Sequence, residues 1–71
     1  MTMIWERSGE AFFGTVTELA GDVRFHLAVE FDGIRWDWAV WRPGEDRDAA
    51  RHGATATRHG AMWQAERATE Q

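Results

Sequence analysis

The clearest structural pattern in this chain is that of residues Arg24–Trp41, RFHLAVEFDGIRWDWAVW. It contains two runs of alternating apolar and polar residues, and the pair Asp32-Gly33 separates them. An Asp-Gly pair between two such runs is typical of a two-residue type I′ turn, whose central residues both need positive φ. We therefore expect an antiparallel hairpin in which the two residues flanking this pair lie opposite each other.

This register divides the hairpin into an apolar face and a mixed face. The apolar face is expected to carry the cross-strand pairs Phe31/Ile34, Val29/Trp36, Leu27/Trp38 and Phe25/Val40. The mixed face is expected to carry Glu30/Arg35, Ala28/Asp37, His26/Ala39 and Arg24/Trp41. On the mixed face we expect an ion pair between Glu30 and Arg35, and Arg24 over the Trp41 ring. A slip of one residue would move every apolar side chain to the other face, so the division into faces is strongly specified.

A further strand is predicted before this hairpin. Ala11–Leu19 is rich in Phe, Val and Thr, which favour strands, and Ala20-Gly21-Asp22 predicts the turn that follows. A two-residue turn there places Phe12, Gly14 and Val16 on the face of Trp36 and Trp38. A three-residue loop places Phe13, Thr15, Thr17 and Leu19 there instead. We favour the first alternative, because a glycine inside a strand leaves room for a neighbouring ring, for which Trp36 is a candidate.

The two ends of the chain are predicted as follows. Ile4-Trp5 forms either a short edge strand or an N-terminal arm. Arg42–Gly53 is expected to be a solvated loop, with one helical turn over Asp48–His52 that ends at Gly53. Thr57 is the expected N-cap of a helix that runs to about Thr69.

One face of this predicted helix is formed by a stripe of mainly small residues, Arg58, Ala61, Ala65 and Ala68. A face of small side chains can approach a sheet closely, and we expect it to cover Trp36 and Trp38. Trp63 lies opposite the stripe and is expected to be exposed. The sequence thus predicts one α+β domain over residues 1–71: a three-stranded antiparallel meander, with or without a short N-terminal strand, and one C-terminal helix on one face.

Composition limits the function. The chain has 71 residues, no cysteine and a net charge of −4, so disulfides, thiolate metal sites and cysteine nucleophiles are excluded. Met1–Trp41 holds three arginines against seven acidic residues, which argues against binding a phosphate backbone and suits a basic partner protein. No run of about 20 apolar residues and no signal-peptide pattern occurs, so a cytoplasmic protein without membrane contact is expected. The absence of Lys and Asn indicates a GC-rich bacterial or phage genome.

No arrangement of residues predicts catalysis, a cofactor or a metal site. The carboxylate pairs Asp46/Asp48 and Asp32/Asp37 have no apolar surroundings that would shift a pKa. The tetrapeptide Arg-His-Gly-Ala occurs at 51–54 and again at 58–61, but its two histidines have no evident third metal ligand. We therefore expect a non-enzymatic protein.

The order of elements β-β-β-α, with Thr57, Ala61 and Ala65-Glu66 in the helix, resembles the N-terminal domain of HicB-type antitoxins. In that family an alanine follows the helix-initiating threonine by four residues. The chain lacks the Leu-Pro-Gly-Cys segment usual before that helix, and it has no room for a C-terminal DNA-binding part. The resemblance implies an activity of binding and neutralising a small basic protein.

The expected function is therefore that of a small acidic protein-binding module, antitoxin-like or a phage-encoded inhibitor. One helix covers one sheet face only, so the opposite face is expected to bind a second copy in a homodimer, a basic partner protein, or both. The candidate partner-binding residues are Phe13, Leu19, Arg24, Trp41 and Trp63, with Phe12 and Val16 beside Trp41 in the alternative register. The alternative function is nucleic-acid binding by the arginines at 42, 47, 51 and 58.

Overall fold

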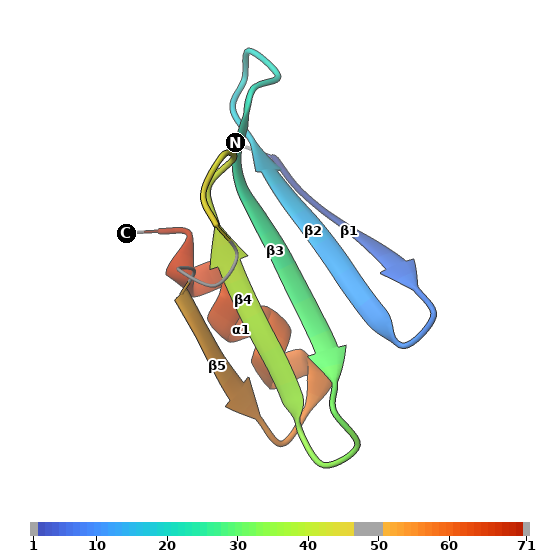
Figure 1. The fold of residues 1–71 in the computed structure, drawn as a ribbon. Coiled ribbons are helices and arrows are strands. Elements are labelled where there is room, and N and C mark those ends of the chain that lie inside the picture. Colours follow the sequence, from blue (N-terminus) through green and yellow to red (C-terminus); the bar gives the residue numbers. More distant parts are fainter. Residues whose placement is uncertain (1, 47–50, 71) are drawn as a thin grey trace.

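The computed structural model describes residues 2–46 and 51–70. The fold is α+β, as predicted: an antiparallel sheet of strand order β1-β2-β3-β4-β5, followed by one C-terminal helix (Figure 1). The elements are β1 (Thr2–Ser8), β2 (Ala11–Thr17), β3 (Val23–Phe31), β4 (Trp36–Trp41), β5 (Arg51–Thr55) and α1 (Arg58–Ala68). The meander therefore has five strands within the described residues, where three were expected, or four with the N-terminal strand.

The N-terminal segment is a full edge strand rather than an arm. β1 pairs with β2 through a turn at Gly9-Glu10, and this pairing places Trp5 opposite Gly14. A Cβ atom at position 14 would lie 3.0 Å from Cε3 of the Trp5 ring. Gly14 thus makes room for an indole, as predicted, but the indole is that of Trp5 and not that of Trp36.

The β3–β4 hairpin has a different register from the predicted one. Phe31 pairs with Trp36, so the connection has four residues, Asp32–Arg35, in place of two. The Oδ1 atom of Asp32 accepts hydrogen bonds from the backbone N–H groups of Ile34 and Arg35, each at 2.8 Å. No non-glycine residue among those described has positive φ, which a type I′ turn would require of Asp32. The Asp32 side chain therefore selects a wider loop.

The register change leaves the division into faces intact. Each β3 residue pairs with a β4 residue two positions beyond the predicted one, and side chains alternate with period two. The predicted faces are confirmed for the residues of β3 and β4, while the predicted pairs are wrong. Ile34 and Arg35 were also assigned to the two faces, but they lie in the loop. Glu30 lies opposite Asp37 rather than Arg35, and Trp41 lies opposite His26 rather than Arg24.

The pairing of β2 with β3 agrees with the favoured faces of β2, but the favoured two-residue turn is wrong. Gly14 pairs with Leu27 and Phe12 with Val29, so β2 turns these residues toward the covered face. The chain leaves β2 at Thr17, where the register shifts, and a loop over residues 18–22 follows. This loop is closed by a hydrogen bond of 2.9 Å from Glu18 N–H to the Asp22 carbonyl.

β5 forms where a loop and a helical turn were expected. Arg51 and His52 belong to this strand, so the predicted helical turn is wrong for them, and its residues 48–50 lie outside the described part of the chain. Gly53 pairs with Trp38, and a Cβ atom at position 53 would lie 2.8 Å from Trp38 Nε1. Gly53 thus admits the Trp38 ring across the strand instead of ending a helix.

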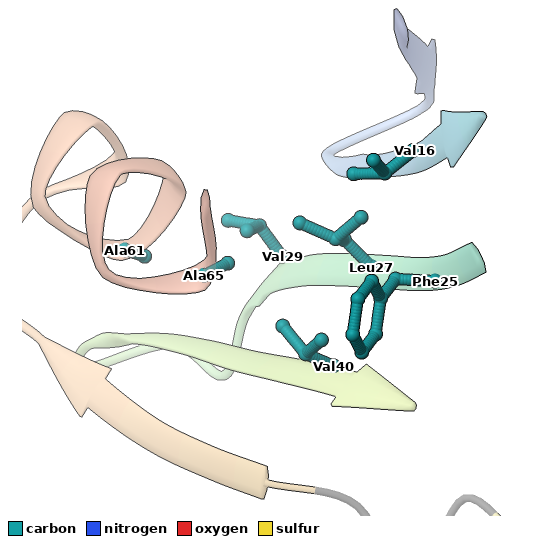
Figure 2. Close-up of a cluster of buried hydrophobic side chains, with 7 residues drawn as sticks. All are labelled: Val16, Phe25, Leu27, Val29, Val40, Ala61 and Ala65. Atoms are coloured by element: carbon teal, nitrogen blue, oxygen red, sulfur yellow. The ribbon is translucent and has the colours of Figure 1, made fainter. Parts of the chain in front are cut away.

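The helix follows the prediction. Thr57 is the N-cap, and its side-chain oxygen accepts a 3.0 Å hydrogen bond from Gly60 N–H. Ala61 and Ala65 are fully buried, and α1 packs on β3, β4 and β5. Figure 2 shows the core that results, whose members are Val16, Phe25, Leu27, Val29, Val40, Ala61 and Ala65. Trp36 and Trp38 are only half-buried and pack against this cluster at its margin.

Candidate binding surface

The helix covers one face of the sheet only (Figure 1). Because Leu27 and Val29 point toward the helix, the alternate residues of each strand point to the other face. No described element packs on that second face. We call it the open face, and its central residues are Ile4, Glu6, Phe13, Thr15, His26, Ala28, Ala39 and Trp41.

Strand pairing arranges these residues in rows across the sheet. One row runs from β1 to β4 through four directly paired residues: Ile4, Thr15, His26 and Trp41. The next row contains Glu6, Phe13, Ala28 and Ala39. Ile4 is 49% exposed and Phe13 is 42% exposed, so the centre of the open face presents large apolar side chains to solvent.

The two rows enclose a shallow depression of about 180 Å³, lined in part by Ile4, Phe13 and Trp41. The His26 and Trp41 rings stack, with centroids 5.7 Å apart and planes at 27°. This stack holds the Trp41 ring beside the depression. The arrangement offers apolar contact area with a polar edge, which is typical of surfaces that bind proteins.

Acidic side chains accompany the apolar rows. Glu6 lies in the second row, and Glu30 lies directly opposite Asp37 one row further on. Together with Glu6, these two residues give the open face three carboxylates. At the same end, the backbone N–H groups of Arg35 and then Ile34 donate to Asp32 and lower the pKa of its carboxyl group. The open face therefore favours cationic contacts.

The structure brings together only part of the predicted partner-binding set. Phe13 and Trp41 lie on the open face in adjacent rows. Arg24 lies near the start of β3, with its Nε 3.6 Å from Glu18 Oε1 and its guanidinium 5.7 Å from the Phe25 ring. Leu19, which was expected on the sheet surface, is 98% exposed in the β2–β3 loop, because β2 ends at Thr17.

Trp63 is exposed, as predicted, but it belongs to another surface. Its side chain is 57% exposed on α1, on the covered side of the sheet, and the Arg67 guanidinium lies 4.9 Å above its ring. The predicted partner-binding set did not include Ile4, Thr15 and His26, although His26 was expected on the same sheet face as Trp41. Their alternation within each strand is visible in the sequence, but their common row depends on three strand pairings.

The arginines of the alternative function do not form one patch. The Arg58 guanidinium lies 5.0 Å above the Phe12 ring, at the start of α1. Arg51 donates to the Ala68 carbonyl at 3.3 Å, at the other end of that helix, and Arg42 lies 5.7 Å from the Phe25 ring. At 1.5 Å per residue, the helix separates its two ends by roughly 15 Å. Arg47 lies outside the described residues.

Among the described residues, no group of three or more His, Cys, Asp or Glu side chains is placed to hold a metal ion. The histidines of the repeated tetrapeptide lie on different elements, with His52 on β5 and His59 on α1. None of the described helices has the length and apolarity that crossing a bilayer requires.

No protein-family model, curated protein or solved structure matches this chain. The resemblance to HicB-type antitoxins therefore stays a prediction.

Proposed function

We propose that this chain is a small protein-binding domain that captures a basic partner protein through its open face. The observation that carries the proposal is the exposure of Ile4 and Phe13 beside Trp41 on a sheet face that no described element covers. Small soluble proteins seldom leave such a group of large apolar side chains in water unless a partner covers it.

The charges on this face favour a basic partner over a second copy. Glu6, Glu30 and Asp37 all point to the open face, and Arg24 at its end lies beside Glu18. Two open faces brought together would confine six such carboxylates to one interface, whereas a cationic partner would add no negative charge there. The activity we propose is neutralisation of the partner by masking its basic surface, as an antitoxin or a phage-encoded inhibitor does.

The test uses a helical peptide of about 14 residues made of Leu and Lys, with the leucines at helical spacing. A peptide of the same composition in scrambled order is the matched ligand control. We expect the ordered peptide to bind, and both Trp41→Glu and Phe13→Glu to weaken binding at least about tenfold. Ile34→Glu is the matched variant control, because Ile34 is 87% exposed in the β3–β4 loop, away from the open face.

Equal affinity for the scrambled peptide, or unchanged affinity after Trp41→Glu, would contradict the proposal. Sedimentation of the wild-type protein tests the other occupant. A dimer that Trp41→Glu dissociates would replace the basic partner by a second copy as the ligand of the open face.

A further inference from the structure

A second surface lies on the covered side of the sheet, where β5 meets α1. It is a groove of about 600 Å³, which we call the Trp groove, lined by Trp38, Arg51, Trp63, Gln64, Arg67 and Ala68. The proposed function makes no use of this groove.

Two indole rings give the Trp groove its apolar surface. The missing side chain at Gly53 lets the Trp38 ring lie across β5, and Trp38 Nε1 donates a 2.9 Å hydrogen bond to Gln64 Oε1 of the helix. This bond fixes the ring between the strand and the helix. Trp63, which is 57% exposed, adds the second indole from the helix side.

The charge of the Trp groove is opposite to that of the open face. Arg51 and Arg67 are among its lining residues, and none of the described residues that line it is Asp or Glu. Arg51 is held at the end of α1 by its hydrogen bond to the Ala68 carbonyl, and Arg67 lies over the Trp63 ring. In a chain of net charge −4, the Arg67 guanidinium favours an anionic side chain in the groove.

The edge of the sheet beside the groove is available for pairing. β5 is the last strand of the sheet, and no other strand in the described part of the chain pairs with its outer edge. A strand added there would alternate its side chains between the two faces. Those on the helix side would lie beside α1, at Trp63 and Arg67.

We propose that the Trp groove binds an extended segment of a partner protein, which joins the sheet beside β5 and places an acidic side chain against Arg67. Main-chain hydrogen bonds to β5 supply affinity, and the groove supplies specificity for an acidic residue two positions from an apolar one. This inference is independent of the proposed function, because the two surfaces lie on opposite faces of the sheet.

The test selects ligands from a phage-displayed library of random peptides of about nine residues, a usual strand length. We expect the selected peptides to carry Asp or Glu two positions from an apolar residue. The most enriched peptide is then synthesised, and its affinity is expected to fall at least about tenfold for Arg67→Gln and for Trp63→Ala. Trp41→Glu is the matched control. It should leave the affinity of this peptide unchanged, whether or not the open face binds a partner.

In nuclear magnetic resonance spectra of the wild type, the peptide should shift the indole N–H signals of Trp38 and Trp63 and the backbone signals of β5. An absence of enrichment, selected peptides without acidic residues, or equal affinity for Arg67→Gln would overturn the proposal. Salt-dependent binding of single-stranded oligothymidylate with a shift of the Trp63 signal would overturn it in favour of nucleic acid. A second copy whose edge strand occupies β5 would likewise overturn it, and sedimentation would detect that species.

Discussion

Gly53→Ala tests the packing that joins β5 to the rest of the fold. The new methyl group would lie 2.8 Å from Trp38 Nε1 and 2.9 Å from Cε2, closer than any ordinary carbon contact. The indole would have to shift away from β5, and this shift would disturb its hydrogen bond to Gln64. Overpacking of this kind destabilises by about 1–3 kcal/mol, while a Gly to Ala change recovers about 0.4–1 kcal/mol from the unfolded chain. We expect a net loss of about 1–2 kcal/mol.

In a domain of this size, that loss lowers the melting temperature by roughly 5–15 °C. Urea denaturation followed by circular dichroism gives the free energy of unfolding. The control is a double-mutant cycle with Trp38→Leu, whose smaller side chain leaves room for the methyl group, so that Gly53→Ala becomes neutral or stabilising in that background. A Gly53→Ala protein as stable as the wild type, or strictly additive effects in the cycle, would show that the Trp38 ring does not exclude a side chain at position 53.

Three other substitutions test separate parts of the fold. Leu27→Ala should lower the free energy of unfolding by about 2–5 kcal/mol, because this side chain is 1% exposed. Ile34→Ala, at 87% exposure, should change it by less than about 0.5 kcal/mol. Urea denaturation measures both values. The loop hydrogen bonds lower the pKa of Asp32 in the folded protein. The stability that they supply is therefore present at pH values above the pKa of Asp32 in the unfolded chain. It is lost as the pH falls through the pKa of Asp32 in the folded protein. Asp32→Asn keeps the acceptor oxygen, so thermal unfolding between about pH 6 and about pH 3 should show a smaller acid loss than in the wild type. Thr57→Ala removes the acceptor for Gly60 N–H and should cost about 1 kcal/mol by urea denaturation, and no loss would show that this cap does not stabilise the helix.

The parts of the fold that could be predicted depend on periodicity. The faces of β2, β3 and β4 follow from alternation, which survives a register change of two residues. The pairs within the β3–β4 hairpin do not follow from it, because the Asp32 side chain binds two backbone N–H groups and widens the loop. A pattern of apolar residues contains no information on that competition.

The repeated tetrapeptide shows that the same local sequence forms two different secondary structures. Arg-His-Gly-Ala forms strand β5 at its first occurrence and the first turn of α1 at its second. At the first, Gly53 lies under Trp38, and at the second, Gly60 follows the Thr57 cap. Gly53 is required by a ring on the neighbouring strand, which local propensity does not reveal. For this reason β5, and with it the Trp groove, could not be predicted from propensity.

The open face could be predicted in part, again from the alternation of residues within each strand. Phe13 and Trp41 were identified from alternation, and both lie on the open face. Leu19 was misplaced because the strand ends before it. His26 was assigned to the correct face, but its row with Ile4 was not predicted, because that row requires the pairing of four strands.

Nuclear magnetic resonance tests most directly whether the open face binds a cationic partner protein. The measurement follows the five indole N–H signals of the protein during titration with the ordered Leu and Lys peptide. Substitution of each tryptophan by phenylalanine assigns the signals. We expect the Trp41 signal to shift on binding, together with the backbone signals of Ile4, Phe13 and His26, and the Trp63 signal to stay in place. A shift confined to Trp63 and the helix, or no shift at Trp41 at saturating peptide, would contradict it.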